Sequence, residues 1–182
     1  MGKNNLKKRK FIYLFLGVVG IAIILIIWKT ISDGDQSTEI TEEEMEEIQE
    51  EQEEIQASID ENFENDSTPT DQLKKYETMS ENSILQEVHK MTHQKVLADK
   101  KWGTVEITKE RVEKLYTVVK NRDDLEHDAL LLDSLSPWVE GDFDNAVEVH
   151  NRIWTIQNGS VGKASRLLTP EEEQEYIKKN FD

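Results

Sequence analysis

One uncharged run near the N-terminus limits the fold of this chain more than any other feature. It extends from Phe11 to Trp28, reads FIYLFLGVVGIAIILIIW, and contains no charged side chain. A helix of this length is about 27 Å long, close to the thickness of the hydrocarbon core of a bilayer. Tyr13 and Trp28 stand near its two ends, where amphipathic aromatic side chains prefer the membrane interface. The run predicts a transmembrane anchor at residues 11–28, with the lipid bilayer as a partner.

The flanking charges predict the orientation of this anchor. Residues 1–10 form a basic tail, which includes Lys7, Lys8, Arg9 and Lys10, whereas only Lys29 closely follows the run. The positive-inside rule places such a tail in the cytoplasm and residues 30–182 outside the cell membrane. A cleaved signal peptide is the alternative. Its apolar core is typically shorter, about 7–15 residues, and small residues follow it, so we favour an uncleaved, single-pass signal-anchor.

Residues 29–73 predict an acidic stalk and linker. From residue 30 onward this segment has no Lys or Arg, and the whole chain has a net charge of −16, which argues against a nucleic-acid partner. Thr41 and Glu44 have the spacing of a capping box, which starts a helix. One thin apolar stripe follows, formed by Met45, Ile48, Ile55, Ile59 and Phe63. We expect a solvated helix; a short coiled coil with weak self-association is the alternative.

A calcium-binding loop is a weaker hypothesis for the start of this segment. Asp33, Asp35 and Glu44 occupy positions 1, 3 and 12 of a loop with EF-hand-like spacing. Position 6 of such a loop requires Gly for a sharp turn, but this chain has Thr38 there. We therefore expect an acidic linker without calcium.

Residues 74–182 predict an extracytoplasmic domain that is mainly α, a small irregular bundle of four or five helices. Expected helix starts follow capping signals at Ser80, Thr108, Asp123 or Asp124, Asp142 and Thr169. The first helix is expected to include Val96 and Leu97, and Ser136-Pro137 is expected to end the third. Residues 104–107 form a short extended stretch, which could be one strand without an evident partner.

Few residues in the chain predict chemistry. The chain has no Cys, and no catalytic motif is apparent, so we expect neither an enzyme nor a cofactor. His89 and His93 are four residues apart, so both can face one metal ion from a helix. Lys90 stands where a zinc protease of the H-E-x-x-H type has its catalytic Glu. A third ligand could come from His127 or His150. Two histidines on the helix surface beside the core are the simpler interpretation.

One segment resembles a known family. Residues 142–175, DFDNAVEVHNRIWTIQNGSVGKASRLLTPEEEQE, together with the single basic-headed anchor, resemble an uncharacterised family of membrane-anchored proteins from Gram-positive spore-forming bacilli. The resemblance covers roughly residues 80–182 and excludes the acidic strip. It implies a bacterial envelope setting and a helical extracytoplasmic domain, and it carries no activity, cofactor or site residue.

Three functional hypotheses follow. The first is a membrane-tethered extracytoplasmic module that binds another protein of the bacterial cell envelope. The second is a metal-binding protein, or a metal-dependent envelope hydrolase, that uses His89 and His93. The third is a regulator that acts through its transmembrane helix.

Overall fold

The computed structural model describes residues 41–181. The basic tail, the predicted anchor at residues 11–28, and Asp33 and Asp35 of the calcium hypothesis lie outside the described residues. Within residues 41–181, no helix is both long enough and apolar enough to cross a membrane. Contacts between residues divide the chain into two units, and the division falls between Glu53 and Glu54.

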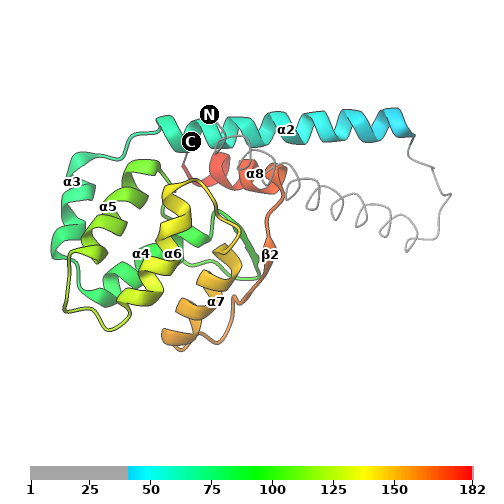
Figure 1. The fold of residues 1–182 in the computed structure, drawn as a ribbon. Helices are drawn as coiled ribbons and strands as arrows, with labels where there is room; N and C mark the ends of the chain where they lie inside the picture. Colours follow the sequence, from blue (N-terminus) through cyan, green and yellow to red (C-terminus); the bar gives the residue numbers. More distant parts are fainter. Residues whose placement is uncertain (1–40, 182) are drawn as a thin grey trace, which may run out of the picture. The chain divides into compact units, whose positions relative to one another are not determined.

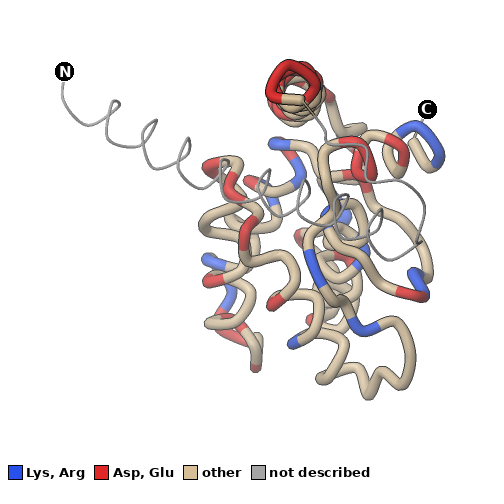
Figure 2. The backbone as a smooth tube through the Cα atoms, turned by 90° about the vertical axis from the view of Figure 1, so that its right-hand side faces the viewer, with Lys and Arg blue, Asp and Glu red and all other residues tan. Residues whose placement is uncertain are grey.

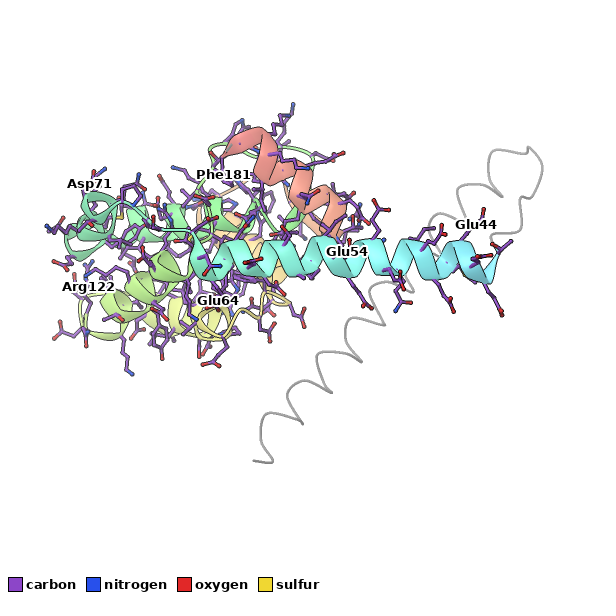
Figure 3. The ribbon with its side chains drawn as sticks, turned by 90° about the horizontal axis from the view of Figure 1, so that it is seen from above. Glu44, Glu54, Glu64, Asp71, Arg122 and Phe181 are labelled. Carbon is purple, nitrogen blue, oxygen red and sulfur yellow. The ribbon has the colours of Figure 1, made fainter. Side chains whose placement is uncertain are left out.

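The predicted stalk helix is present as α2 (Glu42–Asn65). The capping box that predicted it is confirmed: the Thr41 N–H donates to Glu44 Oε2 over 2.8 Å, and the Glu44 N–H donates to Thr41 Oγ1 over 3.2 Å. The carboxylate of Glu44 therefore caps α2. Acidic side chains are spread along the helix, and Figure 3 follows it from Glu44 past Glu54 to Glu64.

The second half of α2 belongs to the C-terminal unit. The ring of Phe63 meets the ring of Phe143 edge-on, with centroids 5.4 Å apart, and Ile59 is also buried. Thr68 follows the helix, and its hydroxyl lies 2.5 Å from that of Thr108. The sequence placed the start of this domain at residue 74, where the charge pattern of the chain changes. In the structure, the last turns of α2 also pack within the C-terminal unit.

Short helices form the body of the C-terminal unit, as the sequence predicted (Figure 1). The helical elements after α2 are α3 (Thr70–Lys75), the 3-10 turn η1 (Tyr76–Thr78), α4 (Glu81–Thr92), α5 (Lys109–Lys120), α6 (Asp128–Val139), α7 (Ala146–Ile156) and α8 (Pro170–Asn180). Helix α5 packs on α6, and α4 packs on α7. The core includes Val88, Leu115, Leu131, Trp138 and Ile153. Lys and Arg residues are interspersed with Asp and Glu along the chain of this unit (Figure 2).

Two predicted helix boundaries were wrong. Helix α6 starts at Asp128 and continues through Pro137, because the fully buried Trp138 holds the last turn in the core. Helix α7 starts after Asn145, whereas Asp142 accepts a hydrogen bond from the Asp144 N–H. The Asn145 amide is held by the preceding helix: it accepts from the Trp138 indole and donates to the Ser134 carbonyl.

The strand prediction was also wrong in position. Val96–Ala98 forms β1, which pairs antiparallel with β2 (Ala164–Leu167). The sequence had placed Val96 and Leu97 in a helix and had proposed a strand at 104–107. In that stretch the Ile107 N–H instead donates to Gln94 Oε1 over 3.0 Å. A strand of three residues is specified by a partner far along the chain, which local periodicity does not reveal.

Replacement of Thr169 by Ala should destabilise the domain by about 1 kcal/mol, the usual cost of losing an N-cap side chain. Thr169 and Glu172 form a complete capping box at the start of α8. Denaturant unfolding of the full chain in detergent would measure the change. The exposed Thr117 in the middle of α5 is a matched control, and Thr117→Ala should change stability by a few tenths of a kcal/mol at most. Equal losses in the two variants would contradict the capping role.

Candidate metal centre

Three histidines converge between α4 and α7. His89 lies in α4, His93 is the C-cap residue of α4, and His150 lies in α7. One ring nitrogen from each lies within 4.8 Å of one from each of the others. The ring centroids are 4.4, 5.1 and 5.5 Å apart. Three imidazoles on one tetrahedral zinc ion, with Zn–N bonds of about 2.1 Å, have ring centres about 5 Å apart. The three rings therefore have the mutual spacing of a metal centre.

Burial keeps this His89/His93/His150 triad neutral. His93 and His150 are almost completely buried. Desolvation lowers the pKa of each to about 4, against smaller opposing effects from hydrogen bonds to backbone carbonyls. Desolvation also lowers the pKa of His89. The neutral imidazole is the form that binds a metal, so at neutral pH the triad needs to lose no proton before it can do so.

The hydrogen bonds of His89 and His93 leave one nitrogen of each available. His93 Nδ1 lies 2.9 Å from the Gly103 carbonyl, which can only accept, so Nδ1 carries the proton and Nε2 has a lone pair. His89 Nδ1 lies 2.7 Å from Gln157 Oε1, which is likewise an acceptor. The His89 Nε2 atom is buried without a hydrogen-bond partner. An outer hydrogen bond on Nδ1 and a free Nε2 is the arrangement of metal-ligating histidines.

His150 has a different hydrogen-bond environment. Its Nε2 lies 2.9 Å from the Gly162 carbonyl, and its Nδ1 lies 2.8 Å from Thr92 Oγ1. The Gly162 carbonyl can only accept, so Nε2 donates to it. The Thr92 hydroxyl donates to the His89 carbonyl oxygen over 2.5 Å, so Thr92 links His89 and His150. Coordination through Nε2 would replace the hydrogen bond to Gly162. The triad thus consists of two histidines with free nitrogens and a third that is held by the loop after α7.

That loop has no room for a side chain at Gly162. Its φ is +87°, and a Cβ there would lie 2.3 Å from the Lys100 carbonyl oxygen. Glycine adopts this conformation without steric cost. The indole of Trp154 donates to the neighbouring Val161 carbonyl over 2.8 Å. The loop therefore approaches both the triad and the segment after β1 through its backbone.

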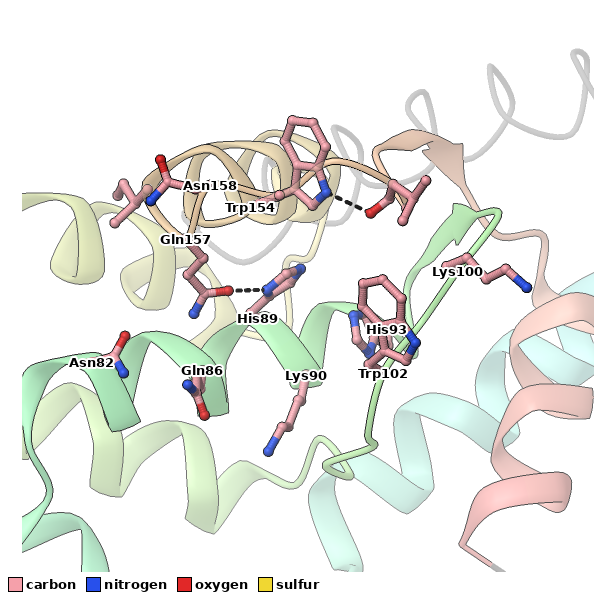
Figure 4. A pocket seen from close by; sticks show the side chains of 14 residues that line it. Asn82, Gln86, His89, Lys90, His93, Lys100, Trp102, Trp154, Gln157 and Asn158 are labelled. Atoms are coloured by element: carbon pink, nitrogen blue, oxygen red, sulfur yellow. Dashed lines mark hydrogen bonds between the residues drawn. The ribbon is translucent and has the colours of Figure 1, made fainter.

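A pocket of about 520 Å³ opens beside the triad, and His89 and His93 form part of its wall (Figure 4). Helix α4 contributes one side, and the end of α7 contributes Trp154 and Gln157 on the other (Figure 4). Among the described residues that line the pocket, none is Asp or Glu, whereas two are Lys. Trp102 stands at its edge with 68% of its surface exposed. The volume is in the range of small-molecule sites.

The sequence identified two members of the triad and left the third open. The structure brings His150 to His89 and His93, whereas the backbone N–H of His127 donates to Glu81 Oε1 over 2.6 Å. Gln157 was missed. The sequence feature that could have identified Gln157 is its position seven residues after His150, because this spacing places both residues on one face of α7. The contributions of Gly103 and Gly162 come from their carbonyls, for which the sequence has no signal.

Comparisons with known proteins place the chain in a family without assigning it an activity. No curated protein and no solved structure matches it. Residues 88–178, which contain the whole triad and Gln157, match a family of unknown function (DUF6241). This agrees with the uncharacterised family that the sequence resembles, while the spore-forming origin stays a prediction. Because the match covers half of the chain, the protein belongs to this family of unknown function, DUF6241.

Proposed function

We propose that this protein is a membrane-tethered metal-binding protein of the bacterial cell envelope, whose C-terminal domain holds Zn²⁺ between His89, His93 and His150. The observation that carries the proposal is the convergence of three neutral histidines, one of which has a buried Nε2 without a partner. The uncharged run at residues 11–28 supports the tether.

The donor set favours zinc over the other common divalent cations. Imidazole nitrogen suits Zn²⁺ and the neighbouring transition metals, whereas Ca²⁺ and Mg²⁺ require oxygen ligands. Three histidines with a fourth position left for a small ligand are a known coordination type for zinc. The triad is itself free of carboxylates.

Metal binding fits the site better than metal-dependent hydrolysis. A hydrolase of the zincin type places a carboxylate beside the metal as general base. No Asp or Glu is among the described residues lining the pocket, and Lys90 occupies the corresponding sequence position. Binding of another envelope protein, and regulation through the transmembrane helix, stay predictions drawn from the sequence.

The test is zinc binding by the full chain in detergent, produced without a histidine tag. Competition with a chromophoric chelator should give one Zn²⁺ per chain. His93→Gln and His150→Gln should each lower the affinity at least 10-fold, and the double variant should lose measurable binding. His127→Gln is the matched control. His127 lies outside the triad, in a partly exposed group with Glu81 and Glu126, so this variant should keep the Zn²⁺ of the triad.

A thermal melt separates loss of the site from loss of the fold. Zinc at 1,000 times its dissociation constant should stabilise the parent and the His127→Gln variant by about 4 kcal/mol through mass action. The double variant should still melt cooperatively, with a midpoint that zinc does not move. Equal zinc effects in the double variant and the parent would overturn the proposal, as would a parent chain that binds no zinc.

A further inference from the structure

We infer that the metal of the proposed centre takes its fourth ligand from the pocket, and that this ligand is an organic carboxylate. The inference rests on the proposed metal-binding function and goes beyond it by naming the chemical class of a ligand. Three observations carry it: the charge of the centre, an unpartnered donor on Gln157, and the walls of the pocket.

The charge of the centre favours an anion. Three neutral imidazoles leave the two positive charges of Zn²⁺ uncompensated. The pocket wall supplies no Asp or Glu, although the chain as a whole is strongly acidic. Lys90 and Lys100 are the charged residues among the described lining. A ligand that brings a negative charge would neutralise this region, and a neutral ligand would not.

Gln157 has a donor that requires an acceptor. Its Oε1 accepts from His89 Nδ1, so its side chain is fixed next to the centre. Its Nε2 is buried without a hydrogen-bond partner, yet the residue lines the pocket. A buried donor that makes no hydrogen bond costs about 1–3 kcal/mol, so such groups in native proteins usually have a partner. An oxygen of a metal-bound carboxylate would accept this N–H.

The walls of the pocket suit an organic group beyond that carboxylate. Trp102 and Trp154 line the pocket on separate elements (Figure 4). Trp102 lies in the segment after β1 and is largely exposed, whereas Trp154 comes from α7. Exposed tryptophan beside a pocket offers a large apolar surface with little conformational entropy to lose. The volume accommodates a ring-sized organic group together with its carboxylate.

The test uses the full chain in detergent, loaded with Co²⁺, whose visible absorption reports a change of coordination. Benzoate is the probe, with inorganic phosphate as a second anion and benzyl alcohol as a neutral analogue. Benzoate should shift the Co²⁺ bands in a saturable manner and quench tryptophan fluorescence. Benzyl alcohol should leave the bands unchanged, and phosphate should require at least 10-fold higher concentrations.

Gln157→Glu provides the specific variant. It keeps an oxygen that accepts from His89 Nδ1 but places a carboxylate where the donor was. At a Co²⁺ concentration that saturates the variant, benzoate affinity should fall at least 10-fold relative to the parent. Gln174→Glu makes the same change on α8, outside the pocket lining, and should behave as the parent.

The outcomes separate the inference from the proposed function. A chain that binds Co²⁺ but shows no band shift with benzoate would overturn the inference and leave the metal site intact. The inference would also be overturned if phosphate produced the same band shift at a lower concentration than benzoate does. The same holds if Gln157→Glu binds benzoate as tightly as the parent. A chain that binds no Co²⁺ would contradict the proposed function itself.

Discussion

The metal-free protein should be about 6 kcal/mol less stable at pH 4 than at pH 7 through His93 and His150 together. His93 and His150 have pKa values of about 4 in the folded protein, because burial disfavours their charged forms. In the unfolded chain a histidine has a pKa of about 6.5. Between these values the unfolded state binds more protons, so stability falls as pH falls. Each of these two residues accounts for about 3 kcal/mol of the loss. This stability is fully present above pH 6.5 and is lost as the pH falls toward 4.

Denaturant unfolding of the full chain in detergent and chelator, between pH 7 and pH 4, would measure this loss. Carboxylates also titrate in this range, so variants must separate the contributions. His127→Gln is the control for the removal of a histidine, because its ring lies outside the triad. In the double variant His93→Gln with His150→Gln, most of the expected loss of stability between pH 7 and pH 4 should disappear. An unchanged dependence in the double variant would show that the triad is not responsible.

Replacement of Glu173 by Ala should destabilise the domain by about 3–5 kcal/mol, the cost of leaving a buried charge without its partner. Glu173 Oε1 lies 2.6 Å from Lys95 Nζ, and both side chains are at least nine-tenths buried. The same oxygen accepts from Gln94 Nε2 over 3.1 Å. After truncation, the Phe143 ring, 4.4 Å from the ammonium, would be a weak substitute. Chemical denaturation at pH 7 would measure the loss.

Two further variants make this prediction specific. Glu148 pairs with Arg152 on the surface of α7, and Glu148→Ala should cost less than 1 kcal/mol. The double variant Lys95→Met with Glu173→Leu removes both charges and should recover most of the stability lost in Glu173→Ala. If the double variant is as unstable as Glu173→Ala, the loss comes from packing, and the explanation by an unpaired buried charge is wrong.

The amino-acid sequence determined the features that depend on neighbouring residues. Thr41, Ser80, Thr108 and Thr169 start helices because each side chain caps a backbone N–H within the next turn. That interaction spans three residues, so the local sequence contains it fully. The spacing of His89 and His93 belongs to the same class, because four residues on a helix define one face.

Only the tertiary structure decided the features that join distant parts of the chain. The choice of His150 over His127 depends on the packing of α4 on α7, and β1 exists because β2 returns to it from nearly 70 residues away. The part of α2 after Glu54 joins the domain because Phe63 meets Phe143. Contacts of this kind arise from burial and side-chain fit, which act between residues regardless of their separation in sequence. Capping and periodicity report nearest neighbours, so they predicted the helices of this domain but not the third member of its triad.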